Sequence, residues 1–339
     1  MWKTAAALLV AVLVIAGAGA AYEQIGRWRD PHRFRQQGRS VSIGDLRFNI
    51  NCTGQGRPVV VLDSGFGVPA LGWALVQPGV AKFTRVCSFD RAGYGWSDPG
   101  PEPRTSERIA VELHDLLNAA GETGPFVMAG HSLGGFTIRV FNKLYPAAVA
   151  GVVLVDAAAE DEDARVEAIV PADIKARKNR PTWSVRLNRW WRPLRINLGV
   201  RRLETVTGWG VDDSDRRLPS ALRQELSYLQ HQGKTERTMD AEAAGFDASI
   251  AEVRRAGTFG NKPLIVLTAG RPYSPDPLLT ADLNTRKDHL WIDELQAEQA
   301  HLSTRGTQIV VSDSSHVIPY DRPDAVIAAI REVWKMIGG

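Results

Sequence analysis

The sequence predicts an α/β fold with a mostly parallel, doubly wound sheet. Short continuous apolar runs, which are typical of strands buried on both faces, alternate with segments of helical periodicity. A Gly-x-Ser-x-Gly pattern stands where one of these runs, Pro125–Ala129, gives way to a helical pattern beginning at Leu133. With 339 residues and 44% hydrophobic content, the chain can bury a large core, so we expect one domain with a sizeable insertion.

The N-terminus carries an uncharged apolar segment. Thr4–Ala21 is long enough to be a membrane span. The Ala18–Ala20 pattern at its end also fits the cleavage site of a signal peptide. We therefore expect 1–21 to be a transmembrane anchor or signal segment, and 22–39 to be a basic linker.

The charge of this linker bears on orientation. Five arginines follow the apolar segment and outnumber the one lysine before it, and the positive-inside rule would then hold the folded domain in the cytoplasm. We expect a membrane-anchored protein with its catalytic domain outside the cytoplasm, for the reason given below for the cysteines. Secretion after cleavage and anchoring toward the cytoplasm are the alternatives.

Each further element follows from a local pattern. Alternating apolar and polar residues around Gly44-Asp45 predict a hairpin over Val41–Cys52. Helical periodicity that stops at Gly121 predicts a helix over Thr105–Ala120. Further strands are expected at Val59–Leu62, Arg85–Phe89, Gly151–Asp156, Pro263–Thr268 and Thr307–Val311, and further helices over Leu133–Tyr145, Leu279–Leu302 and Pro323–Ile337.

Residues 157–255 lack apolar strand runs, so we expect a helical cap inserted over the carboxyl edge of the sheet. Arginines are interleaved there with Trp183, Trp190, Trp191 and Trp209. No stacking-platform or recognition-helix pattern accompanies them and the net charge is only +3, so nucleic acid is not an expected partner. We expect the tryptophans to pack the cap on the core; a surface for lipid is the alternative.

The Gly130–Gly135 segment carries the strongest functional signal. A serine in a sharp turn between strand and helix has a strained backbone and presents its hydroxyl at the carboxyl edge of the sheet. Gly130 and Gly134 stand where side chains would collide as strand and helix pack closely. The free N–H groups of the helix beginning at Leu133 would face a developing oxyanion. Ser132 is therefore a candidate nucleophile.

A serine hydroxyl needs a histidine to accept its proton and a carboxylate to orient that histidine. Of the seven histidines, His316 stands in a polar loop directly after the last expected strand. His131 adjoins the serine, but neighbours on a tight turn point apart, so we expect it to be structural. The other five lie in the linker or in helical patterns.

The order of these features resembles the α/β-hydrolase fold superfamily over residues 40–339. The resemblance implies Ser132 as the nucleophile and His316 as the general base. It also implies an oxyanion hole made by the backbone N–H groups of Phe66 and Leu133. The matching motifs are Ser64-Gly65-Phe66-Gly67, Asp90-Arg91-Ala92-Gly93-Tyr94-Gly95-Trp96-Ser97, Gly130–Gly135, and Ser315-His316 before a terminal helix.

The acid of the implied triad has two candidates. Many members of the superfamily carry it a few residues beyond the seventh strand, but here that loop, Ala269–Asp276, brings Asp276 late. Other members place it at the end of the sixth strand, which corresponds to Asp156. The sequence favours Asp156 and leaves Asp276 as the alternative.

The resemblance implies a serine hydrolase. We expect it to hydrolyse an apolar small-molecule carboxylic ester through an acyl-enzyme on Ser132. Amide or peptide cleavage and carbon–carbon bond hydrolysis on the same residues are alternatives, as is a non-catalytic binding module of the same fold. Epoxide-hydrolase and dehalogenase chemistry is disfavoured because those relatives carry an aspartate nucleophile where Ser132 stands. No motif suggests a metal ion or an organic cofactor, and the sequence does not indicate the oligomeric state.

The two cysteines bear on compartment. Cys52 ends the second expected strand and Cys87 lies inside the fourth. In the fold that the chain resembles these strands are neighbours, with opposite Cβ atoms about 4.5–5.5 Å apart. A disulfide needs about 3.5–4.5 Å, so a small adjustment would allow the bond; two reduced, buried thiols are the alternative. Our hypothesis is that the disulfide forms, which implies an oxidising compartment outside the cytoplasm.

Overall fold

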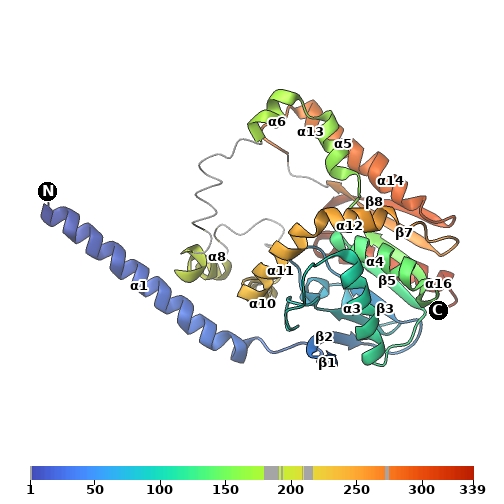
Figure 1. Ribbon diagram of the computed structural model, residues 1–339, viewed down its shortest axis with the longest axis horizontal. Coiled ribbons are helices and arrows are strands. Elements are labelled where there is room, and N and C mark those ends of the chain that lie inside the picture. The colour runs from blue at the N-terminus through green and yellow to red at the C-terminus, as the bar shows by residue number, and fades with distance from the viewer. Residues whose placement is uncertain (1, 179–190, 192–193, 208, 210–216, 272–274) are drawn as a thin grey trace.

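A computed structural model describes residues 2–178, 191, 194–207, 209, 217–271 and 275–339. An eight-stranded sheet in the order β1-β2-β4-β3-β5-β6-β7-β8 forms the centre of the folded body (Figure 1). β1 and β2 form the expected hairpin, β2 is also antiparallel to β4, and the remaining neighbours are parallel, as predicted. The strands are β1 Arg39–Ile43, β2 Leu46–Thr53, β3 Val60–Asp63, β4 Val86–Phe89, β5 Phe126–His131, β6 Val149–Val155, β7 Leu264–Arg271 and β8 Gly306–Ser315.

Helices cover both faces of the sheet. Successive strand residues face opposite sides, so Val61 and Met128 pack under one layer of helices while Val60 and Val127 pack under the other. The first layer is α3 Ser106–Ala119, α4 Leu133–Leu144 and α12 Phe246–Arg254; the second is α2 Gln77–Val80 and α16 Pro323–Met336. Short helical turns complete the body at η1 Ala70–Trp73, η2 Pro146–Ala148 and α15 Ile318–Asp321.

The insertion after β6 is helical in its described part, where it contains no strand, as predicted. Trp191 and Trp209 are 44% and 72% exposed, so the expectation that they pack the cap on the core is wrong for these two. Trp183 and Trp190 lie outside the described residues. The helices that precede α12 are α5 Glu162–Ile169, α6 Ala172–Lys178, α8 Val200–Thr207, α10 Ser220–Gln230 and α11 Gly233–Ala244.

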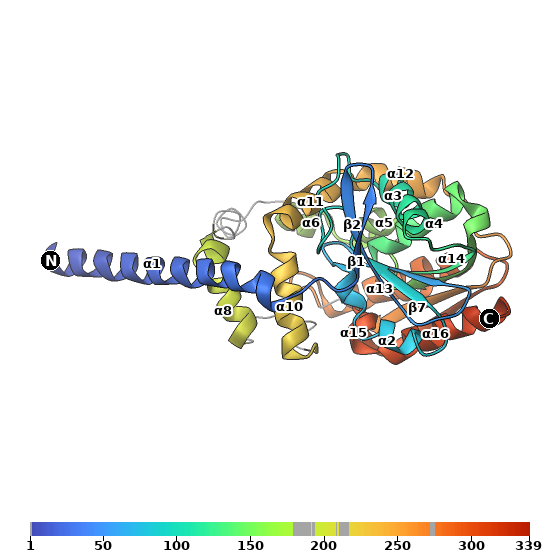
Figure 2. The ribbon, with the colours of Figure 1, turned by 90° about the horizontal axis from the view of Figure 1, so that it is seen from below.

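The N-terminal segment forms one helix, α1 Trp2–Arg33. It contains the apolar run and continues through most of the segment that the sequence suggested as a linker. By length and composition it could cross a membrane, a test that a signal sequence also passes. Figures 1 and 2 show α1 projecting from the folded body, with α8 beside its C-terminal half.

The helix expected over Leu279–Leu302 is interrupted. It consists of α13 Ala281–His289, a π-helical segment η3 Leu290–Leu295, and α14 Gln296–Ala300. Wider turns of this kind often occur at functional sites. Here the wide turn contains Trp291, whose indole N–H donates to the carboxylate of Asp156.

The cysteines are bonded to each other. Cys52 and Cys87 face each other in the register of β2 and β4, and their sulfurs form a disulfide. The hypothesis of a disulfide is therefore confirmed, and the reduced pair is not present. The same two cysteines lie near Glu122 in an arrangement that could hold a metal ion, but both thiols are already used and Glu122 is paired with Arg85.

We predict that the Cys52→Ala/Cys87→Ala double variant is less stable than the wild type. The bond closes a loop with a sequence separation of 35 residues, and loss of that restraint on the unfolded chain costs about 4 kcal/mol in the chain-entropy model. Urea unfolding of both proteins would measure the difference. Reduced wild type serves as the control and should match the double variant; an unchanged midpoint after reduction would contradict the prediction.

Candidate active site

Ser132 occupies a strained turn between β5 and α4. Its backbone has φ 53° and ψ −122°, in the left-handed region that residues other than glycine rarely adopt. The turn has no room for side chains on either flank: a Cβ at Gly130 would lie 2.7 Å from the Gly134 carbonyl, and one at Gly134 would lie 2.5 Å from the Asp63 carbonyl oxygen. The expected glycine requirement is thus a consequence of close packing between β3, β5 and α4.

His316 follows β8 and contacts the carboxylate of Asp156. Its Nδ1 lies 2.6 Å from Asp156 Oδ2. The histidine side chain is 41% exposed, whereas Asp156 is fully buried. Burial alone would lower the pKa of His316, but the hydrogen bond and negative charge of Asp156, helped by the charge of Glu162, outweigh it and raise that pKa above its ordinary value. With Nδ1 held by the carboxylate, Nε2 is the nitrogen left to exchange a proton with a substrate or nucleophile.

Asp156 is itself held in place. It directly follows β6 with φ 41°, and its Oδ1 accepts hydrogen bonds of 2.9 Å from the Ala269 N–H and from the Trp291 indole. Oδ2 is left for His316. These bonds fix the carboxylate, so that it can orient the imidazole.

Asp276 lies in a separate turn. Its Oδ1 accepts a 2.9 Å hydrogen bond from the Leu278 N–H, and its backbone N–H donates to Asn284 Oδ1 at 2.8 Å. Of the two candidate acids, the structure brings Asp156 and not Asp276 into contact with His316.

His131 connects the turn at Ser132 to the His316 loop. Its Nε2–H donates to the His316 backbone carbonyl at 2.9 Å, and the two rings lie 4.9 Å apart between centroids. Burial, followed by the nearby charge of His316, lowers the pKa of His131 to about 3. The ring is therefore neutral near pH 7, which suits the structural role expected from the sequence.

The glycine-rich turn after β3 packs directly on the serine. A Cβ built at Gly65 would lie 3.2 Å from Ser132 Cβ and 3.1 Å from His131 Nδ1. Of the two residues expected to supply oxyanion N–H groups, Phe66 is 41% exposed and lies in this turn, while Leu133 is buried at the first position of α4. Leu133 thus directly follows the serine in the chain, and Phe66 belongs to the turn that packs on the serine.

The buried Arg91 holds the backbone of this turn. The Arg91 guanidinium donates to the carbonyl oxygens of Ser64 and Gly65, to Asp63 Oδ1 at 3.1 Å, and to Glu242 Oε1 at 3.3 Å. Burial alone would lower its pKa, but the charges of Asp63 and Glu242 outweigh that effect and keep the arginine charged. Glu242 belongs to α11, so a residue of the cap helps to hold Arg91 against the turn.

Tyr94 adds a second link between cap and turn. Its hydroxyl donates to Glu242 Oε2 at 2.7 Å and accepts from the Gly67 N–H at 3.3 Å. Burial and the Glu242 charge raise the pKa of Tyr94, so the hydroxyl stays protonated and can donate.

A cavity of about 110 Å³ lies beside this arrangement. It is bounded by the β3 turn at Ser64, by His131 and by the cap helix α10. Most of the other side chains that line it are apolar: Val68, Trp73, Leu226, Val317 and Pro319. A small apolar group would fit there next to the serine turn.

Sequence reasoning missed the supporting residues. Arg91 and Tyr94 belong to the Asp90–Ser97 motif, to which the sequence assigned no role. Their position just after β4, the parallel neighbour of β3, is a signal that could have placed them beside the β3 turn. Glu242 and Trp291 could not have been found, because each reaches the site from a helical segment more than 130 residues away from its partner.

Comparison with known proteins gives relatives across the folded body. The chain matches the model of the alpha/beta hydrolase family over residues 59–329. Bacillus subtilis protein YqjL is 22% identical over 280 residues, which cover 81% of this chain and 83% of that protein. The 2-hydroxymuconate semialdehyde hydrolase of Pseudomonas sp. (strain CF600) is 28% identical over 130 residues, 38% of this chain and 46% of the enzyme. Several other curated relatives are matched over half their length or less.

Solved structures share the fold at low identity. A thermophilic esterase from Thermogutta terrifontis superposes with a TM-score of 0.60 at 20% identity, covering 89% of this chain and all of that one. The enol-lactonase from Burkholderia xenovorans LB400 gives 0.59 at 18%, covering 88% and 100%, and the epoxide hydrolase CorEH gives 0.61 at 17%, covering 88% and 98%. From the family match over most of its length and this shared fold, the chain belongs to the alpha/beta hydrolase family.

Proposed function

We propose that the protein is a serine hydrolase that cleaves small apolar carboxylic esters. The observation that carries the proposal is the contact between His316 Nδ1 and the buried Asp156 carboxylate, at the loop that His131 ties to the strained Ser132 turn. A strained candidate nucleophile, a histidine with one nitrogen held by a carboxylate and a glycine-rich turn packed on the serine together favour acyl transfer.

In the proposed reaction, Ser132 Oγ attacks the ester carbonyl carbon while its proton passes to His316 Nε2. The carbonyl oxygen gains negative charge, which the N–H groups of Phe66 and Leu133 stabilise. The C–O bond to the alcohol then breaks, and the alcohol leaves with the proton from His316. A water molecule, deprotonated by the same nitrogen, attacks the acyl-enzyme; release of the carboxylic acid returns the proton to Ser132.

The size and lining of the 110 Å³ cavity support a short apolar acyl or alkyl group on the substrate. Hydrolysis of a carbon–carbon bond on the same residues is the second candidate, favoured by the partial relationship to the 2-hydroxymuconate semialdehyde hydrolase. Supplying 2-hydroxymuconate semialdehyde beside a series of p-nitrophenyl esters would distinguish the two.

We also propose that α1 is retained as a membrane anchor, with the catalytic domain outside the cytoplasm. The uncharged run Thr4–Ala21 within α1 supports membrane insertion. The Cys52–Cys87 disulfide supports an oxidising compartment.

We predict that Ser132→Ala lowers ester hydrolysis by about 10³-fold or more while the protein stays folded, because only the oxyanion hole and substrate binding would remain. Rates with p-nitrophenyl acetate and longer esters, together with fluorophosphonate labelling, would measure this. Wild type should label and the variant should not. A folded variant that hydrolyses esters at nearly the wild-type rate would overturn the proposal, and wild type that neither labels nor hydrolyses would indicate a binding module.

We predict that Asp156→Asn reduces kcat/KM by about 10⁴-fold, whereas Asp276→Asn, the matched control, leaves it within about threefold. Protonated His316 cannot accept the serine proton, so wild-type kcat/KM should fall on the acid side at an apparent pKa above the ordinary 6.5 of histidine, in keeping with the raised pKa of His316. Residual activity of Asp156→Asn should titrate at lower pH. Loss of activity in Asp276→Asn alone would reverse the assignment of the acid.

We predict that Glu242→Gln lowers kcat roughly ten- to a hundredfold and changes KM less than about twofold. Glu242 contacts Arg91 and Tyr94 rather than the proposed substrate position. Weakening these two contacts should therefore shift the N–H groups of the turn and leave substrate binding nearly unchanged. Glu112→Gln is the matched control, because Glu112 pairs with the buried Arg104 away from the turn. Equal effects of both variants on kcat would contradict a positioning role for Glu242.

A further inference from the structure

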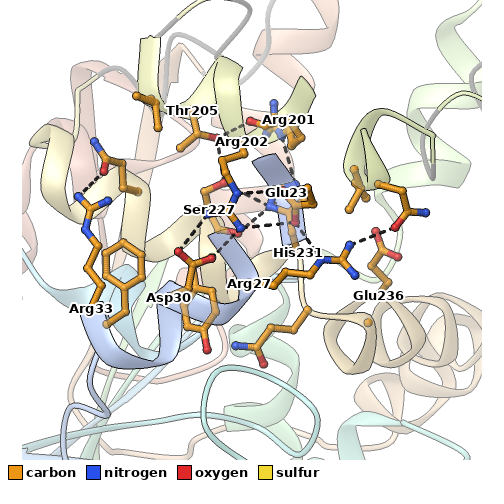
Figure 3. Close-up of a pocket in the computed structure, with 18 residues that line it drawn as sticks. Glu23, Arg27, Asp30, Arg33, Arg201, Arg202, Thr205, Ser227, His231 and Glu236 are labelled. Atoms are coloured by element: carbon orange, nitrogen blue, oxygen red, sulfur yellow. Dashed lines mark hydrogen bonds and ion pairs between the residues drawn. The ribbon is translucent and has the colours of Figure 1, made fainter. Parts of the chain in front are cut away.

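A second and larger cavity lies away from the serine turn. It measures about 480 Å³ and is lined by residues of the C-terminal half of α1 and of the cap, including helices α8, α10 and α11 (Figure 3). Four arginines and three carboxylates line it, so with histidine neutral its lining carries a net charge of +1. None of the chemistry proposed above uses this space.

Helix α1, which forms one wall of the cavity, is bound to the cap by specific contacts. Glu23 and Asp30 are 8% and 4% exposed, and Arg202 of the cap bridges them with hydrogen bonds of 2.9 and 2.7 Å. The backbones also approach closely, since a Cβ at Gly19 would lie 2.5 Å from the Leu198 carbonyl oxygen. Removing Arg202 would leave two buried carboxylates without this partner, which is strongly destabilising. The cavity is therefore bounded by a defined interface between α1 and the cap.

Two of the lining arginines have mainly neutral partners. Arg33 donates to the Gln224 amide oxygen, and Arg201 donates to His231 Nε2 at 3.1 Å. Glu204 is 3.5 Å from Arg201 but is bound more closely by Arg195. A planar guanidinium matches the oxygens of a phosphate in a bidentate manner. A phosphodiester carries one negative charge, which would neutralise the net charge of the cavity.

The cavity begins just beyond the end of the apolar run. Along α1 its lining extends from Glu23, about 3 Å beyond Ala21 at the helical rise of 1.5 Å per residue, to Arg33, about 18 Å beyond Ala21. The headgroup layer of a bilayer is about 5–8 Å thick on each side of the hydrocarbon core. On the cap side, a Cβ at Gly199 would lie 2.9 Å from the Gly19 carbonyl oxygen, which brings neighbouring Arg201 close to the same depth.

Exposed apolar side chains lie on the same two helices, α8 and α1. Leu203 and Val206 of α8 are 50% and 47% exposed, and Val206 lines the cavity. On α1, Tyr22 and Trp28 are 41% and 68% exposed, in the position where aromatic residues commonly meet a membrane interface. A ligand with a phosphate inside the cavity and acyl chains against these side chains would satisfy both surfaces.

We propose that this cavity binds the phosphodiester headgroup of an anionic glycerophospholipid from the membrane that holds α1. The inference rests on the proposed retention of α1 in a membrane, and not on the proposed ester hydrolysis. It has a consequence for the serine site, because α10 separates the two cavities: Ser227 and Tyr228 face the lipid cavity, while Leu226 and Gln230 line the cavity beside Ser64 and His131. A lipid bound in the larger cavity would therefore influence, through α10, the space available in the smaller cavity.

The test uses the full chain in a neutral, nonionic detergent. Calorimetric titration with dihexanoyl-phosphatidylglycerol should give saturable binding, at least about tenfold tighter than dihexanoyl-phosphatidylcholine. Arg201→Gln should weaken phosphatidylglycerol binding by about tenfold or more, through loss of a charge-assisted hydrogen bond. Arg57→Gln, an equal change of charge on the body away from the cavity, should bind as the wild type does.

Each other outcome overturns the proposal. Equal binding of both lipids would remove the anionic preference, and unchanged binding by Arg201→Gln would locate the lipid elsewhere. Inorganic phosphate that binds as tightly as phosphatidylglycerol would identify a site for free phosphate. Failure of the membrane anchor is detected separately, by carbonate extraction of native membranes and by a mature N-terminus near Ala21; failure of the hydrolase proposal is detected by fluorophosphonate labelling.

Discussion

Close packing around the serine turn is the constraint on which the site depends. The β3 backbone lies so near α4 that a Cβ at Gly134 would approach the Asp63 carbonyl oxygen to 2.5 Å. Between these closely packed elements Ser132 has a strained backbone, which costs on the order of 1–3 kcal/mol. The fully buried strand β5 and the buried face of α4 supply the packing that offsets this cost. Relaxing the turn would require the layers of the core to separate.

The parallel sheet explains why residues far apart in sequence meet at this turn. Ser64, Arg91, Ser132, Asp156 and His316 each stand within two residues of the carboxyl end of a strand, respectively β3, β4, β5, β6 and β8. Parallel strands end at a common edge, so these groups are gathered whatever their order in the chain. The same arrangement separates the tasks of the groups: β5, β6 and β8 bring the candidate chemistry, while β3 and β4 bring the turn and the arginine that supports it.

Sequence patterns predicted what local periodicity and chain order determine. The strands, the serine turn and the His316 loop were predicted because each is encoded by adjacent residues. The choice of Asp156 was favoured rather than fixed, since the pairing depends on how the loops after β6 and β7 fold. The role of Glu242 and the docking of α1 were not predicted, because both depend on ion pairs between residues far apart in the sequence. From the sequence alone, the charged residues of the cap could not be distinguished from ordinary surface charges.

The cap contacts have a consequence for substrate entry. α10 reaches the β3 turn through Gln230, whose amide donates to the Gly67 carbonyl at 3.2 Å, and α11 reaches it through Glu242. Only two residues separate these helices, so they cannot move far independently. A displacement of α10 and α11 that opened the small cavity would therefore also withdraw Glu242 from Arg91, and the turn would lose part of its support. Because α8 binds α1 through Arg202, the position of the cap is also tied to the helix that would enter the membrane. Such a movement would therefore couple entry of water at the small cavity to loss of contacts that hold the β3 turn.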